Sequence, residues 1–268
     1  MNLRCLSIIF ETPVNIEKRE YMKPAIIIPT YNERGNIEQL VARIFGLSIP
    51  DLFLIIVDDN SPDGTGAIAD KLTVKHPEVF VLHRQKKEGL GKAYVAGFRK
   101  AFKMGADRIL TMDADFSHDP NIIPALLRAT QDVDLAIGSR YIAGGGTKNW
   151  NLARRLISRL GNFYARNVLG VSIRDMTTGF RCYRANVLQS LDLDHLASGG
   201  YVVLVELAYK TVQAGFRVQE VPILFTERKS GDSKFSLHIF IEAYKNIPKI
   251  RYQRQKAIFS ARKPEKND

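Results

Sequence analysis

The chain has 268 residues, of which 45% are hydrophobic and 25% charged, so it is long enough to bury a core of ordinary globular composition. Its net charge of +11 favours an anionic partner: a nucleic acid, an acidic membrane or a phosphate-bearing substrate. Two cysteines, Cys5 and Cys182, are too few for a disulfide framework or a zinc site, which favours a reducing compartment.

Short apolar runs alternate with amphipathic segments from residue 23 to residue 138. The apolar runs predict buried strands at 25–29, 52–58, 79–83, 108–112 and 133–137. The segments between them have helical periodicity and predict helices at 36–47, 65–75, 91–104 and 120–130. Such alternation predicts an α/β, Rossmann-like layer built on a mostly parallel central sheet.

The character of the sequence changes after Ile142. Three glycines at 144–146 indicate a turn, a basic helical stretch follows, and residues 218–225 predict another strand. The last part is helical and then becomes basic and polar. We therefore expect an N-terminal tail (1–22), one α/β domain (23–235), a surface helix (236–257) and a basic tail (258–268).

Four of the predicted strands end in polar residues that suit one ligand. These are Pro-Thr-Tyr-Asn-Glu at 29–33, Asp-Asp-Asn-Ser-Pro-Asp-Gly at 58–64, Asp-Ala-Asp at 113–115 and Gly-Ser-Arg at 138–140. In an open α/β sheet, ligands bind at the carboxyl ends of the strands. The sequence therefore predicts a binding site at this edge.

The most informative of these groups is the pair Asp113 and Asp115. Two carboxylates one residue apart repel each other unless a hard cation lies between them, and Mg²⁺ or Mn²⁺ takes few protein carboxylates and fills its other positions with water and diphosphate oxygens. Taken alone, the pair is better explained without a ligand, with Asp113 near a helix N-cap and Asp115 in a solvated loop. Its place among the other strand ends favours a metal site.

The adjacent carboxylates Asp58 and Asp59 have two readings that are compatible. Both can cap the following helix, since Asp63-Gly64 forms a turn, and one carboxylate then remains to accept hydrogen bonds from a ribose or a base. Glu33 fits a helix N-terminus, where a negative charge is stabilising, and it fits a ligand contact equally well.

The order of these motifs resembles glycosyltransferase family 2, and more narrowly its dolichol-phosphate (polyprenol-phosphate) mannose synthase group. The matching segments are 29–33, 57–65, 112–118, Gly-Ser-Arg-Tyr at 138–141, Asp-Met-Thr-Thr-Gly-Phe-Arg at 175–181 and Glu-Arg-Lys-Ser-Gly-Asp-Ser-Lys at 227–234. The resemblance extends from about residue 23 to residue 250. It implies a GT-A fold and inverting transfer of mannose from GDP-mannose to dolichyl or another polyprenyl phosphate, with Mg²⁺ or Mn²⁺.

The resemblance also implies roles for single residues. Asp113 and Asp115 would hold the metal and the diphosphate, and the nucleoside pocket would be lined by Pro29, Tyr31, Glu33, Asp58 and Asp59. Ser117 stands where many relatives have a glutamine; as a metal ligand a serine is poorer, so its role is open.

Transfer to a phosphate needs no strong general base, because the acceptor is already ionised near neutral pH. It needs cations that hold the leaving diphosphate and the attacking phosphate. Arg140 at a strand end is a candidate for a bidentate phosphate contact. The resemblance adds one arginine of the pair 154–155, for which we take Arg154, and Arg228 and Lys234; with Asp115, Arg140, Arg228 and Lys234 form the predicted catalytic group.

Two segments have the composition of helices that lie on a lipid surface. Residues 150–170 combine apolar and arginine side chains, and fit membrane contact and packing on the sheet equally well; residues 235–250 are more apolar and favour the membrane. No run of about 18 uninterrupted apolar residues is present to span a bilayer. We expect a peripheral protein on the cytoplasmic face of the endoplasmic reticulum or, in a prokaryote, the plasma membrane, with a small membrane subunit as a possible partner.

Two alternatives remain open from the sequence. One keeps the fold and the lipid acceptor and changes the donor, for instance to UDP-glucose. The other is a basic nucleic-acid-binding protein, against which the acidic strand ends argue because they would repel a polyanion. We therefore expect no nucleic acid partner.

Overall fold

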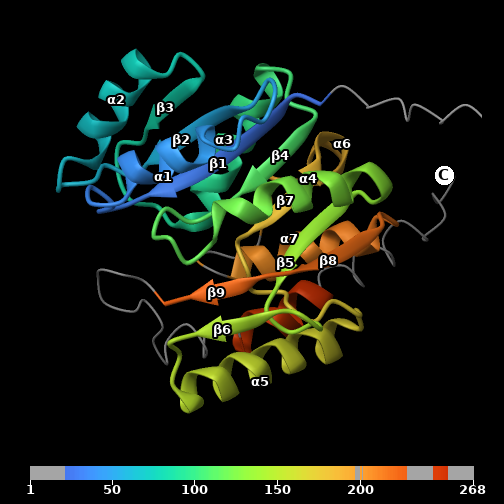
Figure 1. The fold of residues 1–268 in the computed structure, drawn as a ribbon. Coiled ribbons are helices and arrows are strands. Elements are labelled where there is room, and N and C mark those ends of the chain that lie inside the picture. Colours follow the sequence, from blue (N-terminus) through green and yellow to red (C-terminus); the bar gives the residue numbers. More distant parts are fainter. Residues whose placement is uncertain (1–21, 197–199, 201, 228–243, 253–268) are drawn as a thin grey trace, which may run out of the picture.

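The computed structural model describes residues 22–196, 200, 202–227 and 244–252. The first half alternates strands and helices (Figure 1): β1 (Pro24–Thr30), α1 (Ile37–Phe45), β2 (Phe53–Asp58), α2 (Thr65–Lys75), β3 (Val79–His83), α3 (Leu90–Lys103), β4 (Arg108–Thr111), the 3₁₀ turn η1 (Pro120–Ile122), α4 (Ile123–Asp132) and β5 (Leu135–Ser139). These bounds differ by no more than two or three residues from the predicted ones.

The second half is less regular. It contains β6 (Gly146–Lys148), α5 (Leu152–Leu169), β7 (Arg181–Arg184), α6 (Ala185–Ser190), α7 (Val202–Gln213), β8 (Val218–Pro222) and β9 (Leu224–Thr226). Residues 244–252 are also helical. The prediction of a helix over 236–257 is thus met in its described part, and residues 236–243 and 253–257 lie outside the described residues, as do the basic tail and nearly all of the N-terminal tail.

The main sheet has seven strands in the order β3-β2-β1-β4-β7-β5-β8. All neighbours are parallel except β7, which runs antiparallel between β4 and β5. The predicted mostly parallel sheet is therefore confirmed, although β7 was not foreseen as a separate strand. The chain order reverses between β1 and β4, and in sheets of this kind ligands bind at the carboxyl ends of the strands at such a switch point.

Helices cover both faces of this sheet. Alternate residues of β1 point to opposite sides, so that Ile26 and Ile28 pack with α1, α2 and α4, whereas Ala25 and Ile27 pack with α3 and α7. The helix α3 lies very close to β1 because residue 97 is a glycine: a Cβ there would come within 2.5 Å of the Ile27 side chain. The sheet is thus buried on both sides, which explains its continuous apolar strands.

The predicted strand 218–225 divides at Ile223. Residues 218–222 continue the main sheet beside β5, whereas β9 pairs with β6 in a separate two-stranded sheet. Pro222 has no N–H to extend the ladder, and the Ile223 N–H instead donates to the Ser139 carbonyl. The break carries residues 224–227 away from the main sheet toward α5.

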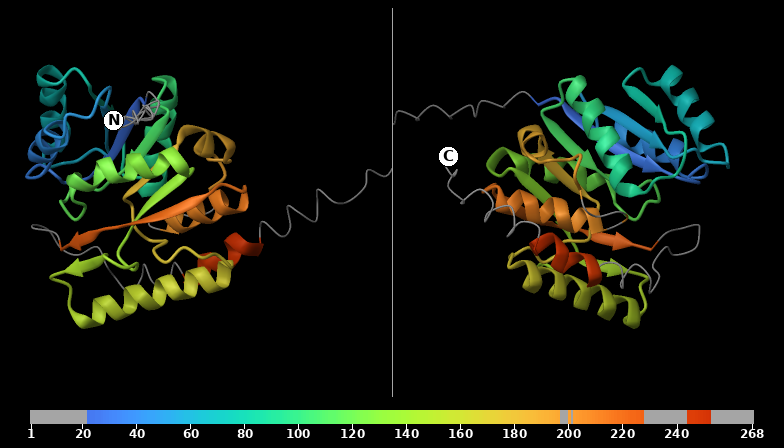
Figure 2. Two further views of the ribbon diagram at one scale, coloured as in Figure 1. Left: turned by 45° about the vertical axis from the view of Figure 1, so that its right-hand side comes forward. Right: turned by 180° about the vertical axis from the view of Figure 1, so that it is seen from behind.

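The helix α5 and helix 244–252 lie side by side below the sheet, as Figures 1 and 2 show from three directions. Tyr164 stacks on Tyr244, and the Arg251 guanidinium donates to the Val168 carbonyl. The surface-helix prediction favoured membrane contact for this second helix, but Ile247 and Ile250 are buried in the core. Its described isoleucines therefore serve packing.

No helix in the described part of the chain is both long and apolar enough to cross a membrane.

Candidate active site

The carboxyl ends of β1 and β2 are joined through the first of the predicted aspartates. The Asp58 carboxylate is 2% exposed and accepts hydrogen bonds from Thr30 Oγ1 at 3.0 Å and from both the hydroxyl and the N–H of Ser61. These contacts occupy both carboxylate oxygens. Asp58 therefore stabilises the loop after β2 by internal hydrogen bonds.

Asp59 has a different environment. Its Oδ1 accepts from Arg84 Nη1 at 2.6 Å, and Arg84 also contacts Glu88. Burial raises the pKa of the Asp59 carboxyl, and the nearby Arg84 charge offsets this only partly. Arg84, which the sequence did not indicate, thus accompanies Asp59 at the predicted nucleoside end.

The segment after β1 reaches the same loops. Pro29 is half-buried at the end of β1, the Glu33 carboxylate accepts from Asn36 Nδ2, and the Glu33 N–H donates to Thr65 Oγ1. The ring of Tyr31 is half-buried, and the Lys87 ammonium lies 3.8 Å from its centroid. These residues form one wall at the β1–β2 end of the sheet.

Asp113 and Asp115 follow β4 directly, as predicted. Asp115 is 2% exposed and its Oδ1 accepts from the Ser117 N–H at 3.0 Å, while Asp113 is half-buried. Phe116 between them and Ser117 has φ 60°, a left-handed conformation that turns the loop back toward the strand. The Ser117 hydroxyl is buried and has no hydrogen-bond partner among the described residues.

This donor set fits a hard divalent cation. It offers carboxylate and hydroxyl oxygens, which Mg²⁺ and Mn²⁺ prefer, and the buried Ser117 hydroxyl is an oxygen with no other assigned contact. The described residues include no cluster of three His, Cys, Asp or Glu side chains that would enclose a metal by themselves. Phosphate oxygens and water would complete the shell.

His118 supports the aspartate loop from below. Its Nδ1 accepts from the Asp113 N–H at 3.0 Å, and its ring stacks on Phe180 and meets Phe225 edge-on. Complete burial lowers the pKa of His118 against the opposing effect of Asp113 and Asp115, and the Nδ1 that accepts from the Asp113 N–H carries no proton in this arrangement. The 3₁₀ turn that follows is capped by Asp119, whose side chain accepts from the Asn121 N–H.

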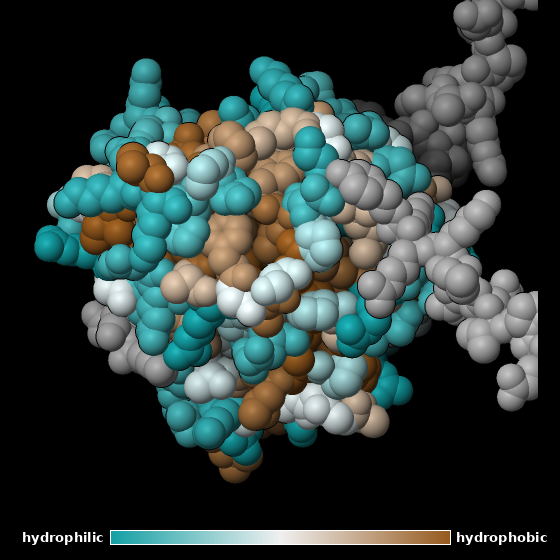
Figure 3. Space-filling model, turned by 45° about the horizontal axis from the view of Figure 1, so that its top comes forward, coloured by the Kyte–Doolittle hydropathy of each residue, from teal (hydrophilic) through white to brown (hydrophobic). Residues whose placement is uncertain are grey.

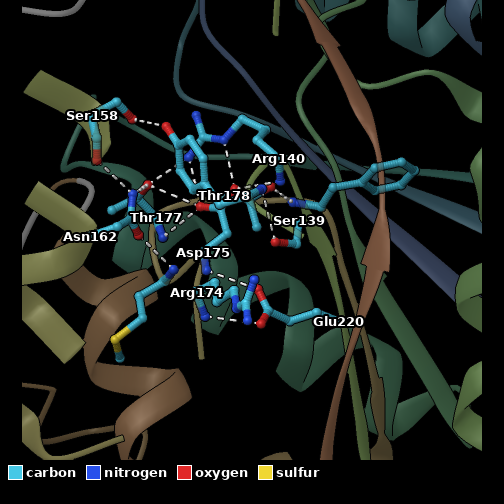
Figure 4. Close-up of polar contacts among 12 residues, drawn as sticks. Ser139, Arg140, Ser158, Asn162, Arg174, Asp175, Thr177, Thr178 and Glu220 are labelled. Carbon is cyan, nitrogen blue, oxygen red and sulfur yellow. Dashed lines mark hydrogen bonds and ion pairs between the residues drawn. The ribbon is translucent and has the colours of Figure 1, made fainter. Parts of the chain in front are cut away.

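Arg140 lies at the end of β5 in a buried ion pair. Its Nε and Nη2 donate to the two oxygens of Asp175 at 2.7 Å, and Nη2 also contacts Thr177 Oγ1 (Figure 4). Burial alone would lower the pKa of Arg140 and raise that of Asp175, but their mutual attraction reverses both shifts. The bidentate fork that was predicted to face a phosphate faces Asp175 in this structure.

The loop that carries Asp175 is held from two sides. The Glu220 carboxylate on β8 accepts from the N–H groups of Arg174 and Asp175, each at 2.9 Å. On α5, the buried Asn162 accepts from the Met176 N–H and donates to Thr177 Oγ1 (Figure 4). The segment 175–181 was quoted for its family pattern, but its partners Asn162 and Glu220 carried no recognisable signal.

Arg154 lies in the first turn of α5. The N-cap residue Asn151 accepts from its N–H, and its Nη1 donates to Glu227 at 2.7 Å. Its guanidinium also lies 4.2 Å from the centroid of the Trp150 ring, which Arg140 approaches at 5.4 Å. Trp150 thus connects two of the predicted phosphate-binding arginines, Arg140 and Arg154.

The structure therefore brings together Asp113, Asp115, Ser117 and Arg140 around His118 and Phe225, with Arg154 beyond Trp150. The residues that were predicted to line the nucleoside pocket lie at the neighbouring ends of β1 and β2. The hydrogen bond from the Asp59 N–H to the Thr30 carbonyl joins these two strand ends. The other two predicted phosphate contacts, Arg228 and Lys234, lie outside the described residues.

A carboxylate pair and several arginines at the switch point of a doubly wound sheet are the parts of an enzyme that handles a nucleotide-activated group. The model of the family described as Glycosyl transferase family 2 matches residues 25–192. The chain belongs to this family and has its GT-A, Rossmann-like fold.

Within the family, the chain is similar to enzymes that use lipid phosphates. It is 45% identical to the undecaprenyl-phosphate mannosyltransferase of Micrococcus luteus over 226 residues, which are 84% of this chain and 93% of that protein. It is 45% identical over 228 residues to the polyprenol monophosphomannose synthase of Mycolicibacterium smegmatis, covering 84% and 85%. The dolichol-phosphate mannosyltransferase of Pyrococcus furiosus is 37% identical over 233 residues, covering 85% and 64%.

Solved structures of the same fold include glucosyl-3-phosphoglycerate synthase from Mycobacterium tuberculosis in complex with Mn²⁺ and UDP-glucose. The TM-score is 0.62 at 18% sequence identity, covering 87% of this chain and 79% of that chain. At this identity the likeness concerns the fold alone.

Proposed function

We propose that this protein transfers mannose from GDP-mannose to a polyprenyl or dolichyl phosphate with inversion at the anomeric carbon. The observation that carries the proposal is the 45% identity to two polyprenyl-phosphate mannosyltransferases over 84% of the chain. The buried oxygen donors at the β4 end and the arginines around Trp150 agree with it.

The nucleoside is proposed to lie at the ends of β1 and β2. There Asp59 is the carboxylate that a base or ribose reaches, because Asp58 is occupied by Thr30 and Ser61. Pro29, Tyr31 and Glu33 line the same wall. An Asp59 that accepts from a base would retain Arg84 as its second partner.

The diphosphate is proposed to lie over Asp113 and Asp115. These residues, with Ser117, would hold Mg²⁺ or Mn²⁺, which when bound neutralises charge on the leaving diphosphate. The related fold of glucosyl-3-phosphoglycerate synthase was solved with Mn²⁺ and with Mg²⁺. His118 Nδ1 accepts from the Asp113 N–H and thereby holds the backbone that carries the first carboxylate.

In the reaction, an oxygen of the acceptor phosphate forms a bond to the anomeric carbon while the bond from that carbon to the diphosphate oxygen breaks. GDP leaves with the bonding electron pair, and no proton has to move because the acceptor is already ionised. Arg140 contributes positive charge near Trp150, and Arg154, Arg228 and Lys234 are proposed to contact the phosphates.

The membrane surface is proposed to be contacted by α5. Leu152, Leu156, Leu160 and Phe163 recur at helical spacing and are all more than half exposed, with Arg155 and Arg159 beside them. Apolar side chains also reach the surface at the lower edge of Figure 3, the side on which α5 lies in Figure 1. A row of leucines flanked by arginines suits the boundary of an anionic bilayer and supports our proposal of a peripheral enzyme on the cytoplasmic face.

The test is transfer of radiolabel from GDP-mannose, and in parallel from UDP-glucose, to polyprenyl phosphate in detergent. We expect label from GDP-mannose in the lipid phase, lost when EDTA is added, and an anomeric configuration opposite to that of the donor. Label from UDP-glucose alone would overturn the donor and keep the reaction type. Label from neither, with and without a membrane fraction that supplies a small subunit, would contradict the proposal.

A further inference from the structure

The two described arginines of the predicted phosphate site, Arg140 and Arg154, are each paired with a carboxylate, and the two pairs differ in kind. Arg140 is held by Asp175 through two hydrogen bonds, and the side chains are 6% and 0% exposed. Arg154 donates from Nη1 to Glu227, and those side chains are 18% and 42% exposed. The difference decides which arginine is able to change partners.

Exchange at Arg140 would leave a buried charge. Asp175 also accepts from the Arg140 and Thr177 N–H groups, and Glu220 and Asn162 hold its loop in place. Withdrawing the guanidinium would leave the carboxylate without its counter-charge at zero exposure, which is strongly unfavourable. Arg140 is therefore bound to its present position and acts on a ligand through its charge.

Exchange at Arg154 meets no such obstacle. A partly exposed ion pair contributes little net stability, because water replaces the lost contact on both sides. Glu227 on leaving Arg154 would still be solvated, being 42% exposed. A phosphate, in contrast, gains a charge-assisted contact to a guanidinium whose position is already fixed.

The position of Arg154 is set by its backbone and by Trp150. Its N–H is capped by Asn151 at 2.8 Å, and its guanidinium lies over the Trp150 ring at 4.2 Å. The first turn of α5 contains no acidic residue, although Arg154 and Arg155 both lie at this positive end of the helix. Glu227 directly follows β9, its N–H donates to the Lys148 carbonyl, and its carboxylate supplies the negative charge that this turn lacks.

We infer that Glu227 is a positioning residue that occupies Arg154 in the absence of substrate and is displaced by a phosphate group of the substrate. The inference rests on the proposed function, because it concerns the same phosphate site. The carboxylate keeps the arginine extended toward β9 and lowers its affinity for other anions. Arg154 is the exchanging phosphate contact, whereas Arg140 is the fixed one.

Two phosphates can be the one that displaces Glu227, the diphosphate of the donor and the monophosphate of the acceptor. Isothermal titration of the full chain with GDP and Mg²⁺, and separately with a short water-soluble prenyl monophosphate, distinguishes them. The variants are Glu227→Gln, Arg154→Gln and the two combined. Asp132→Asn is the charge control. Asp132 is exposed at the end of α4, and its replacement by asparagine removes the same charge as Glu227→Gln.

We expect Glu227→Gln to bind one of the two ligands about threefold to fivefold more tightly, the size of a partly exposed ion pair. Arg154→Gln should weaken the same ligand about tenfold, and the gain from Glu227→Gln should vanish in the combined variant. The KM for that substrate should fall in Glu227→Gln without a lower melting temperature. Asp132→Asn should leave both affinities as they are.

The inference is overturned if Glu227→Gln leaves both affinities unchanged or weakens them, or if it tightens binding equally with and without Arg154. A wild-type enzyme that transfers mannose while these effects are absent refutes the exchange alone. A wild-type protein that binds neither ligand and transfers no sugar refutes the proposed function itself.

Discussion

At the scale of single residues, adjacent carboxylates differ in what their neighbours leave available. The Asp58 carboxylate accepts hydrogen bonds from Thr30 and Ser61 inside a loop. The Asp59 carboxylate instead accepts from the Arg84 guanidinium at the edge of the site. Asp113 and Asp115 differ in the same way, one half-buried and the other 2% exposed. Chemical identity is shared within each pair, so backbone geometry assigns the roles.

The carboxylate charge of Asp115 is predicted to be essential for transfer. Asp115→Asn preserves an oxygen that accepts from the Ser117 N–H but removes the charge that a cation requires. We expect the EDTA-sensitive rate to fall by about 100-fold or more, with the far-ultraviolet circular dichroism spectrum unchanged.

A matched control lies in the same loop. Asp119→Asn likewise preserves an acceptor, for the Asn121 N–H, and removes an exposed charge with no other assigned role. It should retain most of the activity. If Asp115→Asn retained as much activity as Asp119→Asn, the metal assignment would be wrong.

The Arg140–Asp175 pair is predicted to be a large term in stability. Asp175→Asn leaves a buried guanidinium without its counter-charge and should lower the free energy of unfolding by about 3 kcal/mol or more. Denaturation in guanidinium chloride measures this. Asp70→Asn, which removes the exposed partner of His83, should cost less than about 1 kcal/mol.

A double replacement separates the two contributions of this pair. Arg140→Met combined with Asp175→Leu removes both charges and fills similar volume, so much of the stability should return. The transfer activity should not return, because the positive charge near Trp150 is absent. Recovery of activity with stability would mean that the pair serves folding alone.

The pair also predicts a pH dependence of stability. Because the pKa of Asp175 is lowered in the folded protein, its contribution is complete above the ordinary pKa of 3.8 and is lost as the pH falls below that value. The difference in unfolding free energy between wild type and Asp175→Asn should therefore be smaller at about pH 3 than at about pH 6. An equal difference at both pH values would contradict the ion pair.

At the scale of elements, α5 has two unlike faces. Its inner face holds the site through Asn162 and Ser158, the latter accepting from the Tyr141 hydroxyl. Its outer face exposes the leucine row. A contact with lipid on one face therefore lies one helix diameter from the loop that positions Arg140.

The outer face of α5 is predicted to bind anionic vesicles. Leu156→Gln with Leu160→Gln should weaken binding to phosphatidylglycerol-containing vesicles about tenfold, because two partly exposed leucines no longer enter the bilayer boundary. The melting temperature should hardly change. Val74→Gln on α2, an equally apolar exposed position, should have no effect.

Two results would argue against this assignment. Vesicle binding that is unchanged in the leucine variant would place the membrane contact elsewhere. A concentration-dependent dimer that the leucine variant abolishes would identify the face as a contact between two copies of the chain.

At the scale of the whole molecule, the charge of +11 concerns association more than fold. The protein has acidic residues at the strand ends and basic residues around them. A small anion that binds together with a metal cation fits this arrangement, whereas the acidic residues would repel a long polyanion. Binding to anionic vesicles should weaken about tenfold between about 50 and 500 mM salt, and binding to neutral vesicles should change little. Salt-dependent binding of DNA without binding of GDP would instead favour the nucleic-acid alternative.

The first half of the fold, and the edge of the sheet at which the candidate site residues lie, follow from the order of residues along the chain. Continuous apolar strands such as Ile26–Ile28 predict a sheet that is buried on both faces. Polar residues that follow such strands lie together at one edge of a parallel sheet. Asp113 and Asp115 were predicted for this reason, and the resemblance to the family rested on the order of the motifs along the chain.

The pairing of the charges, in contrast, depends on contacts between distant segments. Arg140 and Asp175 are 35 residues apart, and Arg154 and Glu227 are 73 apart, so nothing in the local sequence specifies either contact. The same holds for the antiparallel β7 and for the division of the last strand at Ile223, which depend on neighbours from distant segments. Burial and solvent exposure, and hence which arginine stays fixed and which is able to exchange, arise only when those segments meet.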